Sequence, residues 1–519
     1  MDKPVFTKLT SAMPWGVATR IIAALLGIPI SIIVVRFLGE YNYGIYSILR
    51  IILGFLTIIL GFGLGQAILR YLPEFNVKHQ YDNIRVLILR TLMMHVFLWV
   101  LALFIFFLAG DVLDVWFRTH LKAYLWAGIS ISLLTIVFTT LNQVLTSVYE
   151  TKFIALNQLA RNCLLLILTF WFLKIGLGIY GVFIAAGLCN LFIIISFISK
   201  LLKLFKPKFK SSISMTLEFF DQKRILKYSL PTMSVGLLSL VVWRQSEILL
   251  LGYFFSPLEA GYFNLGYQLP QQILEFIPLA IWPLILASFS EIYSKKHENL
   301  VPAVKIYYKF LFSITVPIAT IGILLGDKAI IILYGENMAK AGLICQAFFF
   351  IFSICFIETP LSMALFVKEK TWINLIFVLS QATLNIALDL LIIPRFGLYG
   401  AIFPVAIVLT LSPYFRYLVV KRLINDVEIP WKFIGKCYLT SLPLLLLLPL
   451  RSFANGSLSF LVILFIAIFI LTVSIRHSEI IEKDDLEIIR ISNIPMKDFL
   501  MKLFIKKNKN MPQPYSVNK

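Results

Sequence analysis

Charged side chains within long apolar segments are the residues of this sequence best suited to chemistry. They are Arg20, Arg50, Arg161, Arg244, Glu247, Glu275 and Asp389. A charge at the centre of a membrane helix costs about 2.5–3.5 kcal/mol on insertion scales, so it faces a cavity, a partner or the interface. Arg20, Arg50 and Arg161 have no opposite charge within their own segments, and neither does Glu275. We expect these four to line a cavity.

The remaining charges have competing explanations. Arg244 and Glu247 are three residues apart, so on a helix they could neutralise each other or face a cavity together. Asp389 lies towards the end of its apolar segment. Four cations stand at segment ends, and such side chains are expected to extend to the hydrated membrane interface. They are Arg36, Lys174, Arg395 and Arg416.

The signs of these charges change along the chain. The earlier segments contribute arginines without a carboxylate near mid-membrane, whereas Glu247, Glu275 and Asp389 all come later. A wall of arginines suits a phosphate or pyrophosphate group, because the planar guanidinium binds such anions through two donors. The acids could balance these arginines or bind a coupling cation.

Other kinds of site find little support in the sequence. There is no H-E-x-x-H, G-x-S-x-G or P-loop motif, and the five histidines are scattered. The run Gly176–Gly181 matches G-x-G-x-x-G, but it stands between two apolar segments rather than after a strand, so we expect a turn. The five cysteines form no C-x-x-C pair and are interpreted as small core residues. We expect no catalytic residue, no metal site, no cofactor and no enzymatic activity.

The elements that position these charges follow from composition. The chain has 519 residues, of which 59% are hydrophobic and only 14% are charged, and its mean hydropathy is +0.88. A soluble fold carries roughly 25% charged residues. In lipid every backbone polar group must be paired within the protein, and the long unbroken apolar runs favour helices over a barrel. The sequence predicts an all-α integral membrane protein.

About 20 mostly apolar residues are needed to cross a bilayer. On this criterion we expect about 14 transmembrane helices. Their predicted ranges are 15–36, 44–69, 84–109, 123–147, 153–173, 180–201, 227–251, 261–289, 305–326, 341–366, 371–392, 398–420, 432–450 and 457–476.

The distribution of lysine and arginine predicts the orientation. With the N-terminus inside, most of these residues fall in cytoplasmic segments, and the loop between the sixth and seventh spans is the most basic. Both termini are therefore expected in the cytoplasm, in a multi-pass protein of the cytoplasmic membrane. The net charge of +20 then meets anionic lipid headgroups, and no nucleic acid is expected as a partner.

An internal repeat divides the predicted helices. Gly176 and Gly181 recur as Gly397 and Gly400, and Pro14 recurs as Pro231, at an offset of about 220 residues. Leu38-Gly39 followed by Gly44 also recurs, as Leu251-Gly252 followed by Gly261 with four residues inserted. We expect two pseudo-symmetric six-helix lobes plus a terminal helix pair, a design suited to alternating access.

The predicted boundaries follow this repeat. They are a first lobe at 1–205, a basic cytoplasmic linker with a possible interfacial helix at 206–226, a second lobe at 227–425, the terminal pair at 426–477 and a cytoplasmic tail at 478–519.

The stretch from residue 36 to residue 74 resembles a known family. The residues that carry the resemblance are Arg36, Leu38, Gly39, Tyr43, Gly44, Tyr46, Gly63, Gly65, Arg70, Tyr71, Pro73 and Glu74. They match the R-x-L-G, Y-G-x-Y and Arg-Tyr-x-Pro-Glu pattern of the polysaccharide (O-antigen type) flippases. This family belongs to the superfamily of multidrug, oligosaccharidyl-lipid and polysaccharide exporters.

The resemblance implies a flippase that moves undecaprenyl-diphosphate-linked oligosaccharide from the inner to the outer leaflet. It implies that Arg20, Arg50 and Arg244 are cavity arginines that bind the substrate. The partners would be the polyprenyl-diphosphate-linked glycan, the lipid bilayer and other polysaccharide-assembly proteins.

Two other functions remain open at this point. A cation-coupled multidrug exporter of the same superfamily would require acids and aromatic residues around a cationic drug, whereas the first span offers arginine. A membrane polysaccharide polymerase or glycosyltransferase would require a sizeable outer loop, and the longest connecting loop is the basic one predicted on the cytoplasmic side.

Overall fold

The computed structural model describes residues 3–205, 222–242, 246–295, 300–368, 370–424, 427–454 and 456–477. Every regular element within these ranges is a helix, as the composition predicts. The linker residues 206–221 and the predicted tail from 478 lie outside the described residues, so the expected interfacial helix and tail are not described here.

The helices of the first half of the chain are α1 (Lys3–Gly61), α2 (Leu64–Val77), α3 (Tyr81–Phe117), α4 (Leu121–Ser147), α5 (Thr151–Lys174) and α6 (Gly178–Phe205). Those of the second half are α7 (Gln222–Leu240), α8 (Ser246–Phe254), α9 (Pro257–Lys295), α10 (Leu300–Tyr334), the 3₁₀ helix η5 (Glu336–Met338), α11 (Lys340–Cys355), α12 (Glu358–Val367), α13 (Thr371–Gly400) and α14 (Ile402–Leu423). The chain then forms α15 (Trp431–Ser441), the 3₁₀ helices η6 (Leu442–Leu447) and η7 (Pro449–Phe453), and α16 (Ser457–His477).

Among the described residues, ten helical stretches are long and apolar enough to cross a membrane. One of them, Leu25–Val77, contains the first two predicted spans. The spans predicted at 227–251, 261–289 and 432–450 fall on α7 with α8, on α9, and on α15 with η6 and η7. The chain is thus an all-helical membrane protein.

One bend separates the first two predicted spans, and the second and seventh predicted spans are themselves interrupted. Gly39 bends α1 between the first two spans, with φ 71° and ψ 174°, a conformation that is open to glycine and costly for other residues. The second span, predicted as one helix over 44–69, breaks where Phe62 (φ 46°) and Gly63 (φ 66°) adopt left-handed conformations. The seventh span widens into a π-turn at residues 241–242 before α8 begins at Ser246.

The thirteenth predicted span also departs from a regular helix. After Ser441 it tightens into η6 and η7, which contain Pro443 and Pro449. A proline has no N–H for an i to i−4 hydrogen bond and its ring clashes with the preceding turn. The prolines therefore account for the 3₁₀ geometry of this segment.

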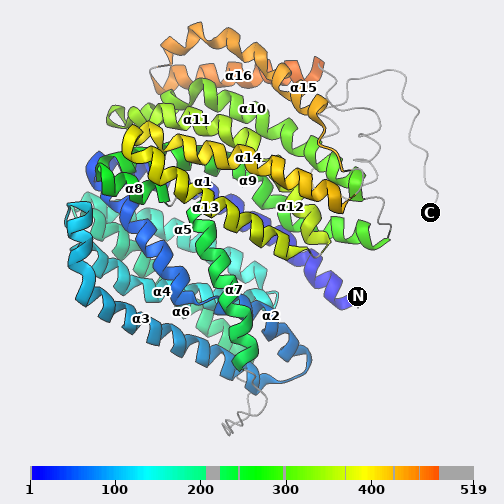
Figure 1. Ribbon diagram of the computed structural model, residues 1–519. Helices are drawn as coiled ribbons and strands as arrows, with labels where there is room; N and C mark the ends of the chain where they lie inside the picture. Colours follow the sequence, from blue (N-terminus) through cyan, green and yellow to red (C-terminus); the bar gives the residue numbers. More distant parts are fainter. Residues whose placement is uncertain are drawn as a thin grey trace.

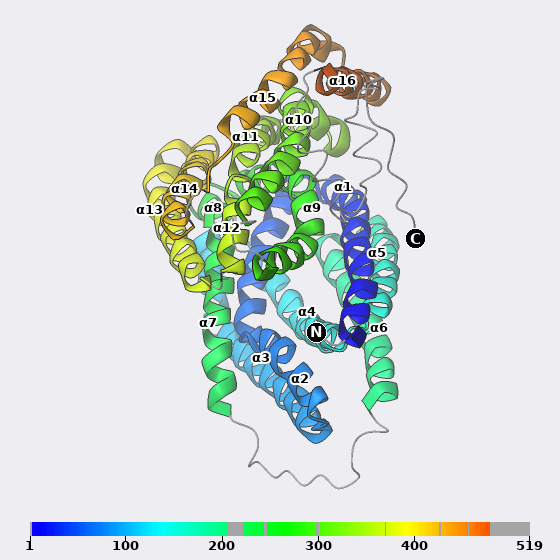
Figure 2. The same ribbon diagram turned by 90° about the vertical axis from the view of Figure 1, so that its right-hand side faces the viewer.

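The helices form two groups that meet along α1, α7, α8 and α9. Figure 1 shows α1 to α6, in blue to teal, in the lower part of the molecule, and α9 to α14, in green to yellow, in the upper part. We call them the N-terminal group (α1–α6) and the C-terminal group (α8–α14). Figure 2 shows α15 and α16 at the upper edge, next to α10. A small leucine-rich cluster is buried between α10, η6 and α16.

The turns predicted from glycine are present. Gly176 (φ 86°) and Gly178 (φ 54°) lie between α5 and α6, and Gly397 (φ 59°) bends the end of α13. The G-x-G-x-x-G run is therefore a turn, as the sequence analysis predicts. Gly63 and Gly65 of the family motif pack closely against neighbouring helices: a Cβ on Gly63 would lie 2.1 Å from the Ser229 carbonyl oxygen, and one on Gly65 would overlap the Gln143 side chain.

Candidate functional site

The two helical groups touch backbone to backbone near Gly39. A Cβ on Gly44 would lie 1.8 Å from the Pro257 carbonyl oxygen, and one on Gly261 would lie 2.9 Å from the Gly44 Cα. No other residue type fits at either glycine without moving one group away from the other. The second half of α1 and the start of α9 are thereby held in direct contact.

Polar side chains join the groups on either side of this contact. The Asn264 amide of α9 donates to the Tyr43 hydroxyl and to the Ser47 hydroxyl of α1, both at 2.9 Å. The Tyr262 hydroxyl donates to the Glu40 carboxylate. Ser47 is 217 residues from Asn264, which is close to the offset of about 220 residues that separates the predicted repeats.

Arg36 extends the same contact towards α10. Its Nε donates to the Leu333 carbonyl at 2.7 Å and its Nη2 to the Ile332 carbonyl at 2.6 Å. The sequence analysis expects this arginine to reach the interface, and the structure gives it a definite partner in the opposite group. Next to it, the hydroxyls of Ser31 and Tyr334 are 3.0 Å apart.

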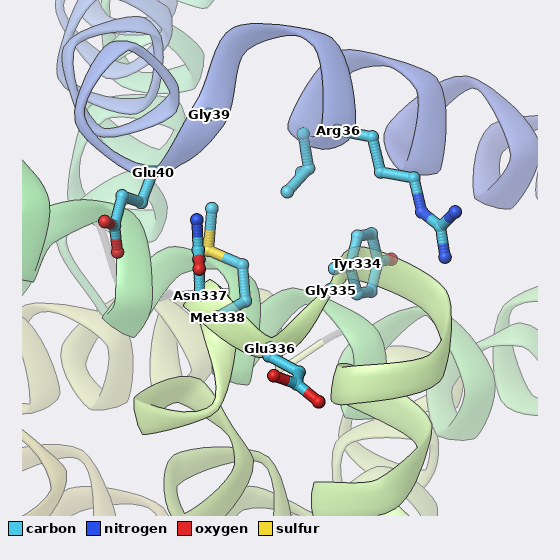
Figure 3. Close-up of a pocket in the computed structure, with 9 residues that line it drawn as sticks. Arg36, Gly39, Glu40, Tyr334, Gly335, Glu336, Asn337 and Met338 are labelled. Carbon is cyan, nitrogen blue, oxygen red and sulfur yellow. The ribbon is translucent and has the colours of Figure 1, made fainter. Parts of the chain in front are cut away.

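A cavity of about 430 Å³ opens beside Arg36. Figure 3 shows it between α1, above, and the connection from α10 to η5, below. Its lining comes from both groups: Val35, Arg36, Gly39 and Glu40 from α1, and Tyr334, Gly335, Glu336, Asn337 and Met338 from the other side. We call the contacts of residues 31–47 with residues 257–264 and 332–334 the Gly39 seam.

A second junction lies just beyond the C-terminal end of α1, where α2 contacts α7, as Figure 1 also shows. Gly63 packs against the Ser229 carbonyl. Arg224 approaches Glu74 at 3.5 Å and lies 4.9 Å from the Tyr71 ring centroid. The motif residues Tyr71 and Glu74, which carry part of the family resemblance, are thus contacts between α2 and α7.

Two buried carboxylates face each other in the C-terminal group. Glu247 of α8 and Asp389 of α13 are both fully buried. The Asn385 amide bridges them, donating to Glu247 Oε1 at 2.7 Å and to Asp389 Oδ2 at 3.1 Å. Glu247 Oε2, Asp389 Oδ1 and Asn385 Oδ1 are buried and find no hydrogen-bond donor among the described residues. Buried acceptors left in this state are costly unless something else fills their coordination.

Arg416 corrects the expectation that it extends to the interface. The arginine is 2% exposed because its side chain turns inward and packs against α12 and α13. Its Nη2 lies 2.6 Å from Glu358 Oε1 of α12, and its Nη1 donates to the Ser362 hydroxyl at 2.9 Å. A buried ion pair with further hydrogen bonds satisfies both charges within the C-terminal group.

Arg161 has a different environment in the N-terminal group. Its Nε donates to the Asn190 side chain at 3.1 Å and its Nη1 to Asn162 at 3.4 Å. The guanidinium carbon lies 5.2 Å from the Phe138 ring centroid, a favourable cation–π position. These partners come from α4, α5 and α6 and carry no charge, so they leave the positive charge of Arg161 unbalanced.

His95 supports the break between α1 and α2. It is 1% exposed, with Nδ1 2.9 Å from the Leu60 carbonyl and Nε2 3.0 Å from the Thr140 hydroxyl. A carbonyl can only accept, so Nδ1 donates to it. The break releases this carbonyl from the helix ladder, and the imidazole takes the place of the missing N–H. The sequence analysis treats the histidines as scattered and misses this role.

The remaining predicted site residues are only partly described. Arg244 lies outside the described residues, and Arg20 lies in α1 with its side chain outside the described part of the structure. Arg50 is exposed in the second half of α1, and Glu275 is half-buried in α9. The structure therefore does not bring the three proposed substrate arginines together as a described cluster.

Residues without charge complete the site and were missed by sequence reasoning. Asn385 stands one helical turn before Asp389, and this i, i+4 polar pair in an apolar helix was a usable signal. Asn264 gave no such signal, because its two acceptors lie on a helix about 220 residues earlier in the chain.

The architecture is that of known transporters. The lipid II flippase MurJ, in an inward closed conformation, shares 16% sequence identity over 89% of this chain and 97% of that chain, with a TM-score of 0.66. An inward-facing multidrug resistance MATE family transporter of the MOP superfamily shares 15% over 78% of this chain and 95% of that chain, with a TM-score of 0.65. An outward-facing multidrug resistance MATE family transporter of the MOP superfamily shares 14% sequence identity over 81% of this chain and 96% of that chain, with a TM-score of 0.59. The chain has the fold of MOP superfamily transporters.

Sequence comparison then gives the family. The family described as polysaccharide biosynthesis protein matches residues 14–289, more than half of the chain. The chain belongs to this family, which confirms the resemblance drawn from residues 36–74. No curated protein sequence matches the chain significantly.

Proposed function

We propose that this protein is a flippase that moves a polyprenyl-diphosphate-linked oligosaccharide, with an undecaprenyl carrier, across the cytoplasmic membrane by alternating access, and that it has no enzymatic activity. The observation that carries the proposal is that a member of the polysaccharide biosynthesis family shares its fold with the lipid II flippase MurJ over 89% of its length. The partners would be the lipid-linked glycan, the bilayer and other polysaccharide-assembly proteins.

The moving parts would be two pseudo-symmetric six-helix lobes, with α15 and α16 as an additional pair. The N-terminal and C-terminal groups correspond to these lobes. Support comes from the Gly39 seam, where Ser47 bonds to Asn264 and Gly44 touches Gly261 across the interface. Meeting of equivalent residues is expected when two copies are related by an axis that passes between them.

With both termini in the cytoplasm, the Gly39 seam would face the outside. The groups are joined there by glycine contacts and by several hydrogen bonds. The structure would then represent a state closed to the outside. The higher TM-score with the inward-facing than with the outward-facing MATE transporter supports this assignment.

The substrate headgroup carries two phosphates and would bind to arginines of the cavity. We assign this role to Arg20, Arg50 and Arg244, because paired guanidinium donors suit phosphate oxygens. Arg161 supports the assignment indirectly, since its charge is held by neutral partners and adds to a positive field on the N-terminal side. The glycan would occupy the hydrated cavity and the polyprenyl chain would remain in lipid.

The acids of the second lobe would couple transport to a cation. Glu247, Asn385 and Asp389 together present three buried oxygen atoms that find no donor in the described part of the chain. Oxygen ligands of this kind suit a hard cation, and a proton shared by the carboxylates would satisfy them equally. Occupancy would bias the transport cycle if the cation binds one conformation more tightly than the other. Glu275 of α9 would face the substrate cavity that the arginines line.

The test is transport by purified protein in proteoliposomes that contain lipid-linked oligosaccharide. We expect Arg20→Ala, Arg50→Ala and Arg244→Ala each to slow the appearance of glycan in the opposite leaflet. Arg395→Ala is the control, because Arg395 is an exposed arginine that is expected at a segment end and not in the cavity. Absence of any transport by the parent protein would contradict the function. Full transport by all three variants would contradict the site alone.

A multidrug exporter is the second candidate, since MATE transporters share the fold with TM-scores up to 0.65. The arginines of the N-terminal group argue against a cationic drug. Drug susceptibility of a deletion strain distinguishes the two functions. Formation of a new glycosidic bond by the purified protein would instead favour a polymerase.

A further inference from the structure

Arg36 has no part in substrate binding or cation coupling as proposed above. It is an exposed residue three positions before the bend at Gly39, and its side chain crosses from the N-terminal to the C-terminal group. Both of its acceptors are backbone carbonyls of the last turn of α10, at residues 332 and 333. Within the described residues no carboxylate lies within 4.0 Å of its guanidinium.

These carbonyls are free because the helix ends there. The last four carbonyls of an α-helix have no N–H partner within it. The Gly335 N–H donates to the Ile331 carbonyl at 2.8 Å. Within the described part of the chain, no backbone N–H donates to the carbonyls of Ile332 and Leu333. The C-terminus of a helix also carries a partial negative charge, which favours a cation. Arg36 is therefore a helix cap supplied by the opposite group.

We propose that Arg36 is the latch of the gate at the Gly39 seam: its two hydrogen bonds to the end of α10 hold the lobes together there and must break before that end opens. The inference rests on the alternating access of the proposed function. It assigns a role to a residue of the R-x-L-G motif that substrate binding does not explain.

The surroundings make this bond reversible. The guanidinium is exposed, and the cavity of about 430 Å³ beside it is lined by both groups. Water can therefore reach the arginine and the α10 carbonyls when they separate, so neither is left unpaired in an apolar environment. The Glu40–Tyr262 and Asn264 contacts lie on the same seam but join α1 to α9. The Ser31 and Tyr334 hydroxyls also join α1 to α10, but Arg36 is the residue that binds the backbone carbonyls at the end of α10.

The test measures the distance between the groups by double electron–electron resonance. Spin labels are attached at Tyr41→Cys in α1 and Leu343→Cys in α11, two exposed residues on opposite groups. The background carries Cys163→Ser, because Cys163 is the exposed cysteine of the chain. We compare Arg36→Ala and Arg36→Lys with Arg395→Ala, which removes an exposed arginine of α13 that makes no hydrogen bond or ion pair with the N-terminal group among the described residues.

We expect Arg36→Ala to raise the population at longer distances at least threefold over Arg395→Ala, with Arg36→Lys in between because lysine keeps the charge but loses the planar pair of donors. Equal distributions in Arg36→Ala and Arg395→Ala overturn the proposal. The experiment requires no substrate, so its outcome is separate from that of the transport assay. A protein that does not transport lipid-linked glycan can still show the distance change in Arg36→Ala, and a protein that does transport it can still show none.

Discussion

The two helical groups treat a buried arginine in opposite ways. In the C-terminal group Arg416 is neutralised by Glu358 and hydrogen-bonded by neighbouring polar side chains. In the N-terminal group Arg161 is held by two asparagines and a phenylalanine ring, which leave its charge in place. The acids Glu247 and Asp389, in contrast, have no described cation beside them.

This difference indicates which group is suited to a cation and which to an anion. Among the described residues, the C-terminal group neutralises its buried arginine and keeps two carboxylates without a cation, which suits a cation, whereas the N-terminal group keeps the positive charge of Arg161, which suits an anion. In the proposed function, separate sites for the two ions would let binding of one alter the affinity for the other through motion of the two groups. Four substitutions test the comparison, from the largest expected effect to the smallest.

The largest effect is expected at Arg416. Arg416→Ala leaves the Glu358 carboxylate without its counter-charge, and breaking a buried pair from one side costs about 3–5 kcal/mol. We expect a large drop in thermal stability of the detergent-solubilised protein. The double variant Arg416→Met with Glu358→Met should recover most of the loss, because it removes both charges. A single variant as stable as the parent would show that the pair is not buried in solution.

The next effect is on cation dependence. Asp389→Asn removes one carboxylate but keeps its size, and a coupling free energy of 1–3 kcal/mol corresponds to about a 5–150-fold effect on affinity. We expect the stabilisation of the protein by its coupling cation, measured by thermal shift with sodium and at several pH values, to be lost. Glu428→Gln serves as a control, since Glu428 is exposed near α15. Unchanged dependence in Asp389→Asn would remove this pair from the coupling scheme.

A smaller effect on stability is expected at Arg161. Arg161→Met loses hydrogen bonds to neutral acceptors but also removes a charge that is costly to bury, so the net loss should stay below about 2 kcal/mol. Thermal unfolding beside Arg416→Met, which leaves Glu358 unpaired, gives the direct comparison. If both variants lose the same stability, the two arginines are not in different environments.

The smallest effect is expected at the junction of α2 with α7. Glu74 is partly exposed and pairs with Lys78 at 2.8 Å and Arg224 at 3.5 Å. Glu74→Gln should change stability by no more than about 1 kcal/mol, as is usual for exposed ion pairs. A high-salt measurement on the parent provides the control, because salt screens the same interactions. A loss of several kcal/mol would place this pair among the buried ones.

The apolar runs were sufficient to predict the helices, because their length reports the thickness of the bilayer. The bend at Gly39 and the turns at Gly176 and Gly397 were also readable, since glycine marks positions with positive φ. The break at Phe62 was not readable. A phenylalanine in a left-handed conformation has no sequence signal and depends on His95, from another helix, to pair the Leu60 carbonyl.

The sequence indicates the charged residues of the candidate site but not the partners that they contact. Arg416 is expected to extend to the interface from near a segment end, yet its side chain turns into the C-terminal group and reaches Glu358, 58 residues earlier in the chain. Arg36 was recognised as a helix-end arginine, but its acceptors are backbone carbonyls, which every residue has. Partners of this kind are fixed by tertiary packing and leave no pattern in the sequence.

The contact of Gly44 with Gly261 bears on the origin of the chain. If the two halves descend from one duplicated gene, both glycines descend from one ancestral position. Before the duplication, that glycine would have met its own copy in a second subunit across a two-fold axis, which is an isologous contact. Fusion then freed the two positions to change separately, and the glycines persist because a side chain on either one would collide with the other half. On that premise, the contact between the two groups would preserve the interface of a former homodimer.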